Sequence, residues 1–247
     1  MAFFTDIKIA ASDYGEGFKL ISKLGLWKFT LIPALIAIGL AALFIWGGWY
    51  FATDIGAAIA QIWPFEFGAS FFRSLSNFIG GLSVIVVGFF AFKHLLMAVC
   101  GPFMAPISQK VEDHLNGDKV VSEIGFMSSL VRSIRINIRL ILIELLISVP
   151  LLLLSLIPML NIISSILLFY ASSYFTGFGA MDYCLERHYK TSDSVKFVRA
   201  NKGLATGNGI IFNLILLIPV IGVLVVLPIS TAAATISTFN RMNKKEG

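Results

Sequence analysis

An apolar run from Phe29 to Ala52 constrains this chain more than any other feature. The run contains no charged side chain, and it is longer than the roughly 20 residues that an α-helix needs to cross a bilayer. Trp46, Trp49 and Tyr50 lie at its far end, where aromatic side chains gather at membrane interfaces. We therefore predict that residues 29–52 form a transmembrane helix.

The composition extends this prediction to the whole chain. Of the 247 residues, 57% are hydrophobic and 13% are charged, about half the charged share of an ordinary soluble domain. The net charge is +5, but the basic residues are spread over the gaps between apolar runs and form no long basic stretch. This pattern argues against a nucleic-acid partner and favours an integral membrane protein in contact with lipid.

Three further apolar segments follow the first. Residues 75–103 can cross the membrane again, and Gly101-Pro102 is expected to end that helix. The other two segments carry a proline near their middle, Pro158 and Pro219, which predicts two helical hairpins. The second is too short for two full crossings, so we expect the hairpins to penetrate part of the bilayer. The sequences around the two prolines are similar, which favours a duplicated unit.

The predicted fold is a single all-α integral membrane domain with two long transmembrane helices, two partially penetrating helical hairpins and an N-terminal amphipathic helix. That first helix has apolar residues at steps of three and four, which is typical of a helix on the membrane surface; a helix packed in a soluble cap is the alternative. The expected segments are an entry (1–28), span 1 (29–52), span 2 (75–103), a cytoplasmic-side helical region (104–139), hairpin 1 (140–183), a cytoplasmic loop (184–203) and hairpin 2 (204–238).

Basic residues indicate the orientation of this domain. The first 28 residues hold four lysines, segments 104–139 and 184–203 hold five basic residues each, and the tail after 238 holds three. The loop 53–74 holds one, Arg73. The positive-inside rule therefore predicts a multi-pass protein of the cell inner membrane with both termini in the cytoplasm.

No set of residues suggests catalysis. The three histidines are scattered, and neither a nucleophile motif nor a glycine-rich phosphate loop is present. Cys100 and Cys184 lie far apart without the spacing of a metal site or disulfide framework. We predict a protein that is not an enzyme and that holds no metal or cofactor.

Polar residues within apolar segments are the informative ones, because they are costly inside a membrane. Asn137 and Glu144 share one helical face with Ser133 and Ser148, whereas Arg132, Arg135 and Arg139 lie roughly opposite. The first face is a candidate lining of an aqueous path, and Arg132 and Arg135 are further pathway candidates. The alternative is an interfacial helix with solvated charges. Lys93 in span 2 is a further pathway candidate, unless it extends to the cytoplasmic interface.

A second candidate site precedes span 1. Gly25, Leu26 and Lys28 form a basic turn at a helix start, where free backbone N–H groups and a lysine can hold an oxyanion. The alternative is that Gly25 only separates two helices and Lys28 only anchors the second.

Several motifs together resemble one family. These motifs are the run GFKLISKLGLWKFTLIP, the turn Gly101-Pro102-Phe103 followed by Glu112, the pair Asp182-Tyr183 and the Ile218-Pro219 hairpin tip. Together they resemble the CysZ-type sulfate permeases of the etoposide-induced membrane-protein domain superfamily. The resemblance covers nearly the whole chain. It implies homo-oligomers that take up sulfate for cysteine synthesis, with sulfate bound at the turn before span 1.

Carried over by position, Gly25, Leu26 and Lys28 match that sulfate-binding turn, whereas Trp27 stands where the family pattern has an arginine. An arginine offers a bidentate contact to an oxyanion that tryptophan lacks. The expected function is a sulfate or oxyanion permease, and the alternative is a membrane interaction or scaffold protein of the same fold without transport.

Overall fold

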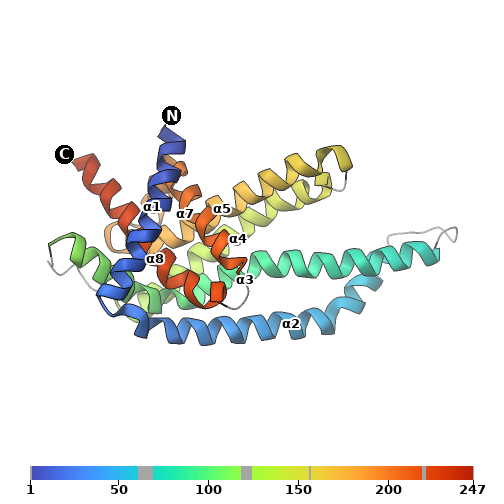
Figure 1. Cartoon of the computed structure of the whole chain (residues 1–247). Coiled ribbons are helices and arrows are strands. Elements are labelled where there is room, and N and C mark those ends of the chain that lie inside the picture. The colour runs from blue at the N-terminus through green and yellow to red at the C-terminus, as the bar shows by residue number, and fades with distance from the viewer. Residues whose placement is uncertain (1, 61–68, 118–123, 156, 219–220, 247) are drawn as a thin grey trace. The chain divides into compact units, whose positions relative to one another are not determined.

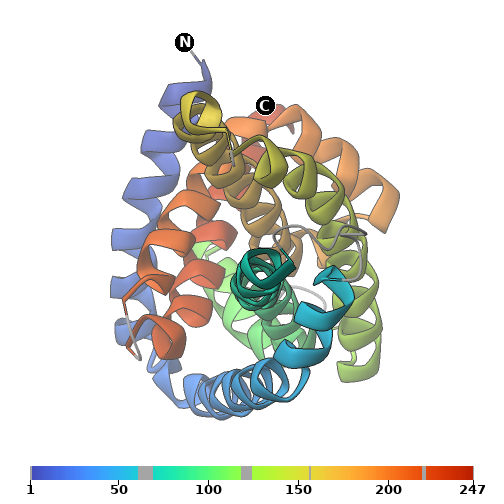
Figure 2. The ribbon, with the colours of Figure 1, turned by 90° about the vertical axis from the view of Figure 1, so that its right-hand side faces the viewer.

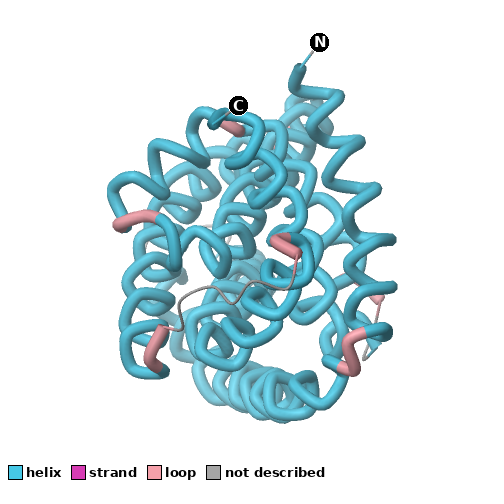
Figure 3. The backbone as a smooth tube through the Cα atoms, turned by 90° about the vertical axis from the view of Figure 1, so that its left-hand side faces the viewer, coloured by secondary structure: helices cyan, strands magenta, loops and turns pink. Residues whose placement is uncertain are grey.

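The computed structural model describes residues 2–60, 69–117, 124–155, 157–218 and 221–246. Across these ranges the only regular secondary structure is helix, joined by short turns (Figure 3). In chain order the elements are α1 (Ala2–Lys23), a 3-10 helix η1 (Leu26–Thr30), α2 (Leu31–Ala60), α3 (Ala69–Leu115), α4 (Phe126–Ser155), α5 (Pro158–His188), α6 (Thr191–Ala200), α7 (Lys202–Leu216) and α8 (Ile221–Glu246).

The prediction of an all-α multi-pass membrane protein is confirmed. Within the described ranges, five helical stretches are long and apolar enough to cross a membrane. They are Leu26–Gly47, Ala91–Leu115, Phe126–Ser155, Met159–His188 and Gly222–Lys244. Partial penetration of the bilayer by the two hairpins stays a prediction. Helices α4, α5 and α8 contribute stretches long enough to cross, whereas α7, the first arm of the second hairpin, does not.

The helix ends differ in part from the predicted segments. Helix α3 continues through Gly101-Pro102 to Leu115, so this pair does not end it. Helix α4 begins at Phe126 and joins the end of the predicted polar region to the first arm of hairpin 1. Pro158 starts α5 in the first helical turn, a position that needs no backbone N–H donor. The second predicted tip, Pro219, lies outside the described residues.

The chain divides into two compact units, one comprising Met1–Ala37 with His94–Gly247 and the other Ile38–Lys93. In the second unit, Trp46 stacks on Tyr50 with ring centroids 5.7 Å apart, and Trp49 is 85% exposed. Such exposure of large aromatic rings agrees with the predicted aromatic belt.

The core of the first unit is the packing of α5 against α4, α7 and α8; Figure 1 shows α4 and α5 running side by side to their shared tip. Glycines allow the closest of these approaches. A Cβ atom on Gly177 of α5 would lie 1.7 Å from the Ala205 carbonyl oxygen, and one on Gly209 of α7 would lie 1.7 Å from that of Ser173. The two backbones therefore meet with no room for a side chain.

Helix α1 packs along α7 and α8 (Figure 2). Ala10, Tyr14 and Ile21 of its apolar face are buried, whereas Phe18 is 50% exposed. Asp6 and Asp13 are buried as well, at 9% and 6% exposure. Asp6 forms an ion pair with Arg241, and Asp13 accepts a hydrogen bond from Ser237 at 2.6 Å. The amphipathic helix is therefore part of the helical bundle, and these two acidic residues face inward because α8 supplies their partners.

Candidate anion turn and buried polar cluster

The turn before α2 takes the sharp form that the sequence suggests. Gly25 has φ 61° and ψ 34°, a left-handed conformation that suits glycine, and it redirects the chain from α1 into η1. Trp27 closes this turn: its indole N–H donates to the Ser22 hydroxyl at 3.1 Å, and its ring packs edge-on against Phe18. Leu26 is fully buried. Gly25, Leu26 and Trp27 therefore shape the turn, and Lys28 is left as its charged group.

A second lysine lies beside Lys28. The Lys28 and Lys110 ammonium groups lie 5.4 Å and 5.7 Å from the centroid of the same ring, Phe29. Both lysines are exposed, and together they present two positive charges, one from η1 and one from α3. The sequence analysis missed Lys110 because only the fold brings α3 next to the turn.

Lys110 also lines a pocket with a volume of about 460 Å³. Arg187 contributes a further positive charge to its lining and Asp113 a negative one. Arg187 is paired with Glu112, whereas Lys28 and Lys110 are exposed cations that the structure places at the predicted anion turn.

Asn137 and Glu144 belong to a buried polar cluster, which we define as His94, Asn137, Glu144 and Ser148. His94 Nε2 lies 2.5 Å from Glu144 Oε2, and His94 Nδ1 lies 3.3 Å from Asn137 Oδ1. All four side chains are at most 3% exposed. The predicted polar face of α4 is thus buried against α3, and the interpretation as a solvated interfacial helix does not hold for it.

Hydrogen bonds orient the side chains of this cluster. The Asn137 amide donates from Nδ2 to the Ser133 carbonyl oxygen at 2.9 Å, which leaves Oδ1 to accept from His94. Both ring nitrogens of His94 therefore face acceptor atoms. A proton therefore lies between His94 Nε2 and Glu144 Oε2, since two bare acceptors would repel each other at this distance. Glu144 also has a further interaction within the described structure.

Ser148 lies one turn beyond Glu144 on α4. Its hydroxyl oxygen is buried and has no hydrogen-bond partner within the described part of the chain. A buried hydroxyl without a hydrogen bond lowers the stability of the folded state. Ser148 also extends the polar face of α4 by one turn past Glu144.

Arg132, a pathway candidate, has a structural role in this fold. It donates to the Asp182 carboxylate at 2.8 Å and 3.1 Å, to the Ser194 hydroxyl at 2.7 Å and to the Tyr189 carbonyl oxygen at 2.6 Å. These contacts join α4 to α5 and to the start of α6, and they use both terminal nitrogens and Nε of the guanidinium group.

The remaining two pathway candidates differ in burial. Arg135 is exposed on α4. Lys93 is fully buried and has an interaction partner, but it is the last residue of the second unit. Of the predicted pathway residues, the structure brings together Asn137 and Glu144 and adds His94.

A second buried group surrounds Glu112. Its carboxylate accepts from Arg187 at 2.6 Å and 3.0 Å and lies 2.5 Å from His188 Nε2. The ligand atoms of Glu112, Cys184 and His188 lie within 4.8 Å of one another, a spacing that can suit a metal ion. Arg187 already neutralises Glu112, however, so a metal ion would have to displace a positive charge.

Comparison with known proteins gives a family for the chain. The family model described as sulfate transporter CysZ/etoposide-induced protein 2.4 matches residues 13–226. No curated protein sequence matches the chain closely enough to report. The matched residues include the anion turn, the buried polar cluster, predicted hairpin 1 and the first part of predicted hairpin 2.

Proposed function

The chain belongs to the CysZ/etoposide-induced protein 2.4 family, and from this premise we propose that it is an inner-membrane permease for sulfate or a related oxyanion, supplying sulfate for cysteine synthesis. The proposal includes the homo-oligomer and the cytoplasmic termini expected from the sequence. The observation that carries it is the buried polar cluster, which lies between two helical stretches able to cross a membrane. Ionisable residues at such positions usually serve transport rather than stability.

We propose that this cluster acts on an anion through the proton held at the His94–Glu144 contact. An ionised carboxylate repels an oxyanion strongly in a medium of low dielectric constant, and protonation removes that repulsion. Coupling of sulfate passage to a proton is therefore part of the proposal.

Lys28 and Lys110 supply an anion-binding step at the cytoplasmic end of the proposed path. Their two ammonium groups lie around one aromatic ring at the turn before α2, and both are exposed to the medium. Positive charges at the mouth of a path raise the local concentration of an anion and speed its association.

Radiolabelled sulfate uptake into proteoliposomes tests the proposal. We expect uptake above that of empty vesicles, faster with an inward proton gradient. The Lys28→Ala/Lys110→Ala variant is expected to raise KM about tenfold, whereas the control Lys8→Ala, which removes an exposed lysine of α1, leaves KM unchanged. Uptake equal to that of empty vesicles would overturn the proposal.

One observation favours the second candidate, a membrane scaffold without transport. Trp27 replaces the arginine of the family pattern, and its indole N–H is directed to Ser22 of the protein's own turn. Under this alternative, crosslinking recovers a protein partner. Sulfate produces no thermal shift in the parent protein, and it produces none in the Trp27→Arg variant. Under the permease proposal, Trp27→Arg increases sulfate affinity because it restores the bidentate donor.

A further inference from the structure

A pocket between α4 and α5 has a volume of about 670 Å³, which is large for an inorganic anion. It lies outside the buried polar cluster and the anion turn. Its lining combines apolar side chains, two tyrosines and two cations: Ile147, Leu151, Leu167, Tyr170, Ala171, Tyr174, Phe175, Arg199 and Lys202.

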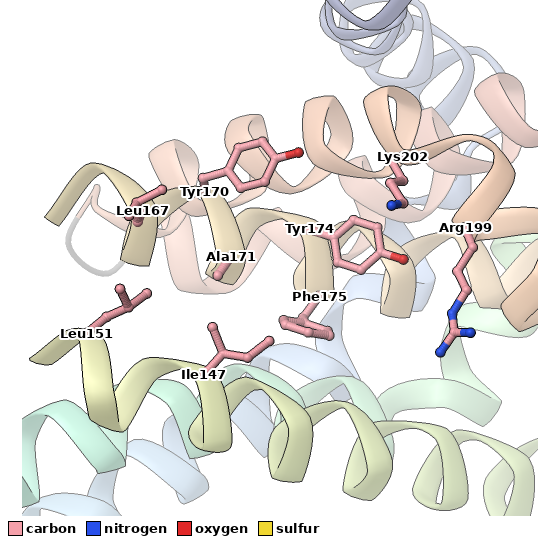
Figure 4. A pocket seen from close by; sticks show the side chains of 9 residues that line it. All are labelled: Ile147, Leu151, Leu167, Tyr170, Ala171, Tyr174, Phe175, Arg199 and Lys202. Carbon is pink, nitrogen blue, oxygen red and sulfur yellow. The ribbon is translucent and has the colours of Figure 1, made fainter. Parts of the chain in front are cut away.

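The polarity of this pocket changes along its length (Figure 4). Leu151 and Leu167 lie at the end nearer the tip of the hairpin, whereas Arg199 and Lys202 lie at the other end. Tyr174 is between them, with its ring beside the apolar part and its hydroxyl directed toward the cations. The pocket is therefore apolar toward the hairpin tip and positive at its base.

The two cations are available to a ligand. Arg199 lies in the last turn of α6 and Lys202 begins α7, and both side chains are exposed. Neither forms an ion pair with any residue that the structure describes. Lys196, also on α6, differs because it pairs with Asp193 at 2.9 Å.

We propose that this pocket binds an anionic glycerophospholipid, with its phosphate between Arg199 and Lys202 and an acyl chain along Leu151, Ala171 and Leu167. The charge complementarity selects an anionic headgroup over a neutral one. The apolar length selects a lipid over a free oxyanion, which would leave most of the pocket unfilled. The basic segment 184–203 is expected on the cytoplasmic side, where anionic lipids attract lysine and arginine side chains.

This inference does not depend on sulfate transport. The test uses the full-length protein in nanodiscs and compares phosphatidylglycerol with phosphatidylcholine, with bound lipid measured by native mass spectrometry after transfer to detergent. We expect phosphatidylglycerol to be retained preferentially. The Arg199→Gln/Lys202→Gln variant is expected to weaken this retention about tenfold, since each cation near a membrane surface contributes substantially to anionic-lipid binding.

Two further variants separate headgroup from chain. The control Lys190→Gln/Lys196→Gln removes the same charge from the same segment but no pocket residue, and it should retain the lipid. Ala171→Phe fills the apolar part, keeps both cations and should lose the lipid. Any of three results would overturn the proposal. They are equal retention of phosphatidylglycerol and phosphatidylcholine, equal loss of phosphatidylglycerol in the two double variants, and full retention of phosphatidylglycerol by Ala171→Phe. Inorganic phosphate that displaces the lipid at millimolar concentration would also overturn it, because the site would then be one for a free oxyanion.

Discussion

At the scale of a single residue, burial changes the pKa of Asp13. It lies between α1 and α8, and only the Ser237 hydroxyl donates to its carboxylate in the described structure. Burial raises the pKa of Asp13 from 3.8 to about 6, the hydrogen bond from Ser237 opposes this, and nearby Glu16 adds to it. The folded protein therefore binds this proton more tightly than the unfolded chain does.

The sign of the pH dependence follows from that raised pKa. Since the folded state holds the proton between pH 4 and 6, the contribution of Asp13 to stability falls as the pH rises through this window. Asp13→Asn keeps an oxygen acceptor for Ser237 and removes the ionised form. We expect it to raise Tm by a few degrees at pH 7.5 and to have little effect near pH 4.

Thermal unfolding in detergent at the two pH values measures this difference. Asp193→Asn is the matched control, because Asp193 is on the surface of α6 and pairs with Lys196. A Tm for Asp13→Asn below that of the parent protein at pH 7.5 would contradict the prediction.

The His94–Glu144 pair gives a second prediction at this scale. Glu144→Leu leaves His94 Nε2 buried without its partner, and breaking a buried pair from one side costs about 3–5 kcal/mol. His94→Leu/Glu144→Leu removes both polar groups and should unfold at a higher temperature than either single variant. Additive losses in the double-mutant cycle would show that the two side chains are not coupled.

At the scale of the helices, glycine on α1 sets how closely it approaches α8. A Cβ atom on Gly17 would lie 2.9 Å from the Ala233 backbone nitrogen, whereas one on Gly15 would meet nothing within 4 Å. Gly17→Ala is therefore expected to destabilise the protein by about 1–3 kcal/mol, and Gly15→Ala, in the same helix, to be neutral or stabilising. Chemical or thermal unfolding of the two variants checks this, and equal stability would contradict the close contact.

The helices differ in how far the sequence could predict them. Apolar runs predicted the spans because a bilayer demands length and low charge, and α2, α4 and α5 follow those runs. Helical periodicity also placed Asn137 and Glu144 on one face. It could not supply His94, which lies on α3, nor Lys110, because contacts between helices depend on tertiary packing. The inward direction of Asp6 and Asp13 was missed for the same reason.

Helix ends were the weakest part of the prediction, for a local reason. Gly101-Pro102 reads as a break, yet α3 continues through it. A Cβ atom at Gly101 would lie 2.0 Å from the Ser133 hydroxyl oxygen, so this glycine serves the close packing of α3 against α4 rather than a turn. A glycine at a helix crossing and a glycine at a helix end look alike in a single sequence.

At the scale of the whole molecule, the first and last helices relate the termini to the membrane. Asp6 of α1 contacts Arg241 near the end of α8, and Gly17 faces Ala233 earlier in that helix. The two helices are therefore antiparallel, and both termini lie at the same end of this pair (Figure 1). Any membrane orientation of the first unit places the N-terminus and the C-terminus on the same side.

The basic residues then decide which side this is. Because the four basic-rich segments are expected in the cytoplasm, Lys8→Cys and Lys244→Cys should both resist a membrane-impermeant thiol reagent in intact cells and react after permeabilisation. Cys100 and Cys184 are buried and give little background labelling, and Asp54→Cys, in the predicted outer loop, should react without permeabilisation. Labelling of only one terminus in intact cells would contradict the antiparallel pairing of α1 and α8. Labelling of both would preserve that pairing but reverse the orientation. It would also place Lys202 of the lipid pocket on the outer surface, away from the anionic cytoplasmic leaflet, because the neighbouring Gly203 and Asn201 contact Asp6 and Arg241 at the end that holds both termini.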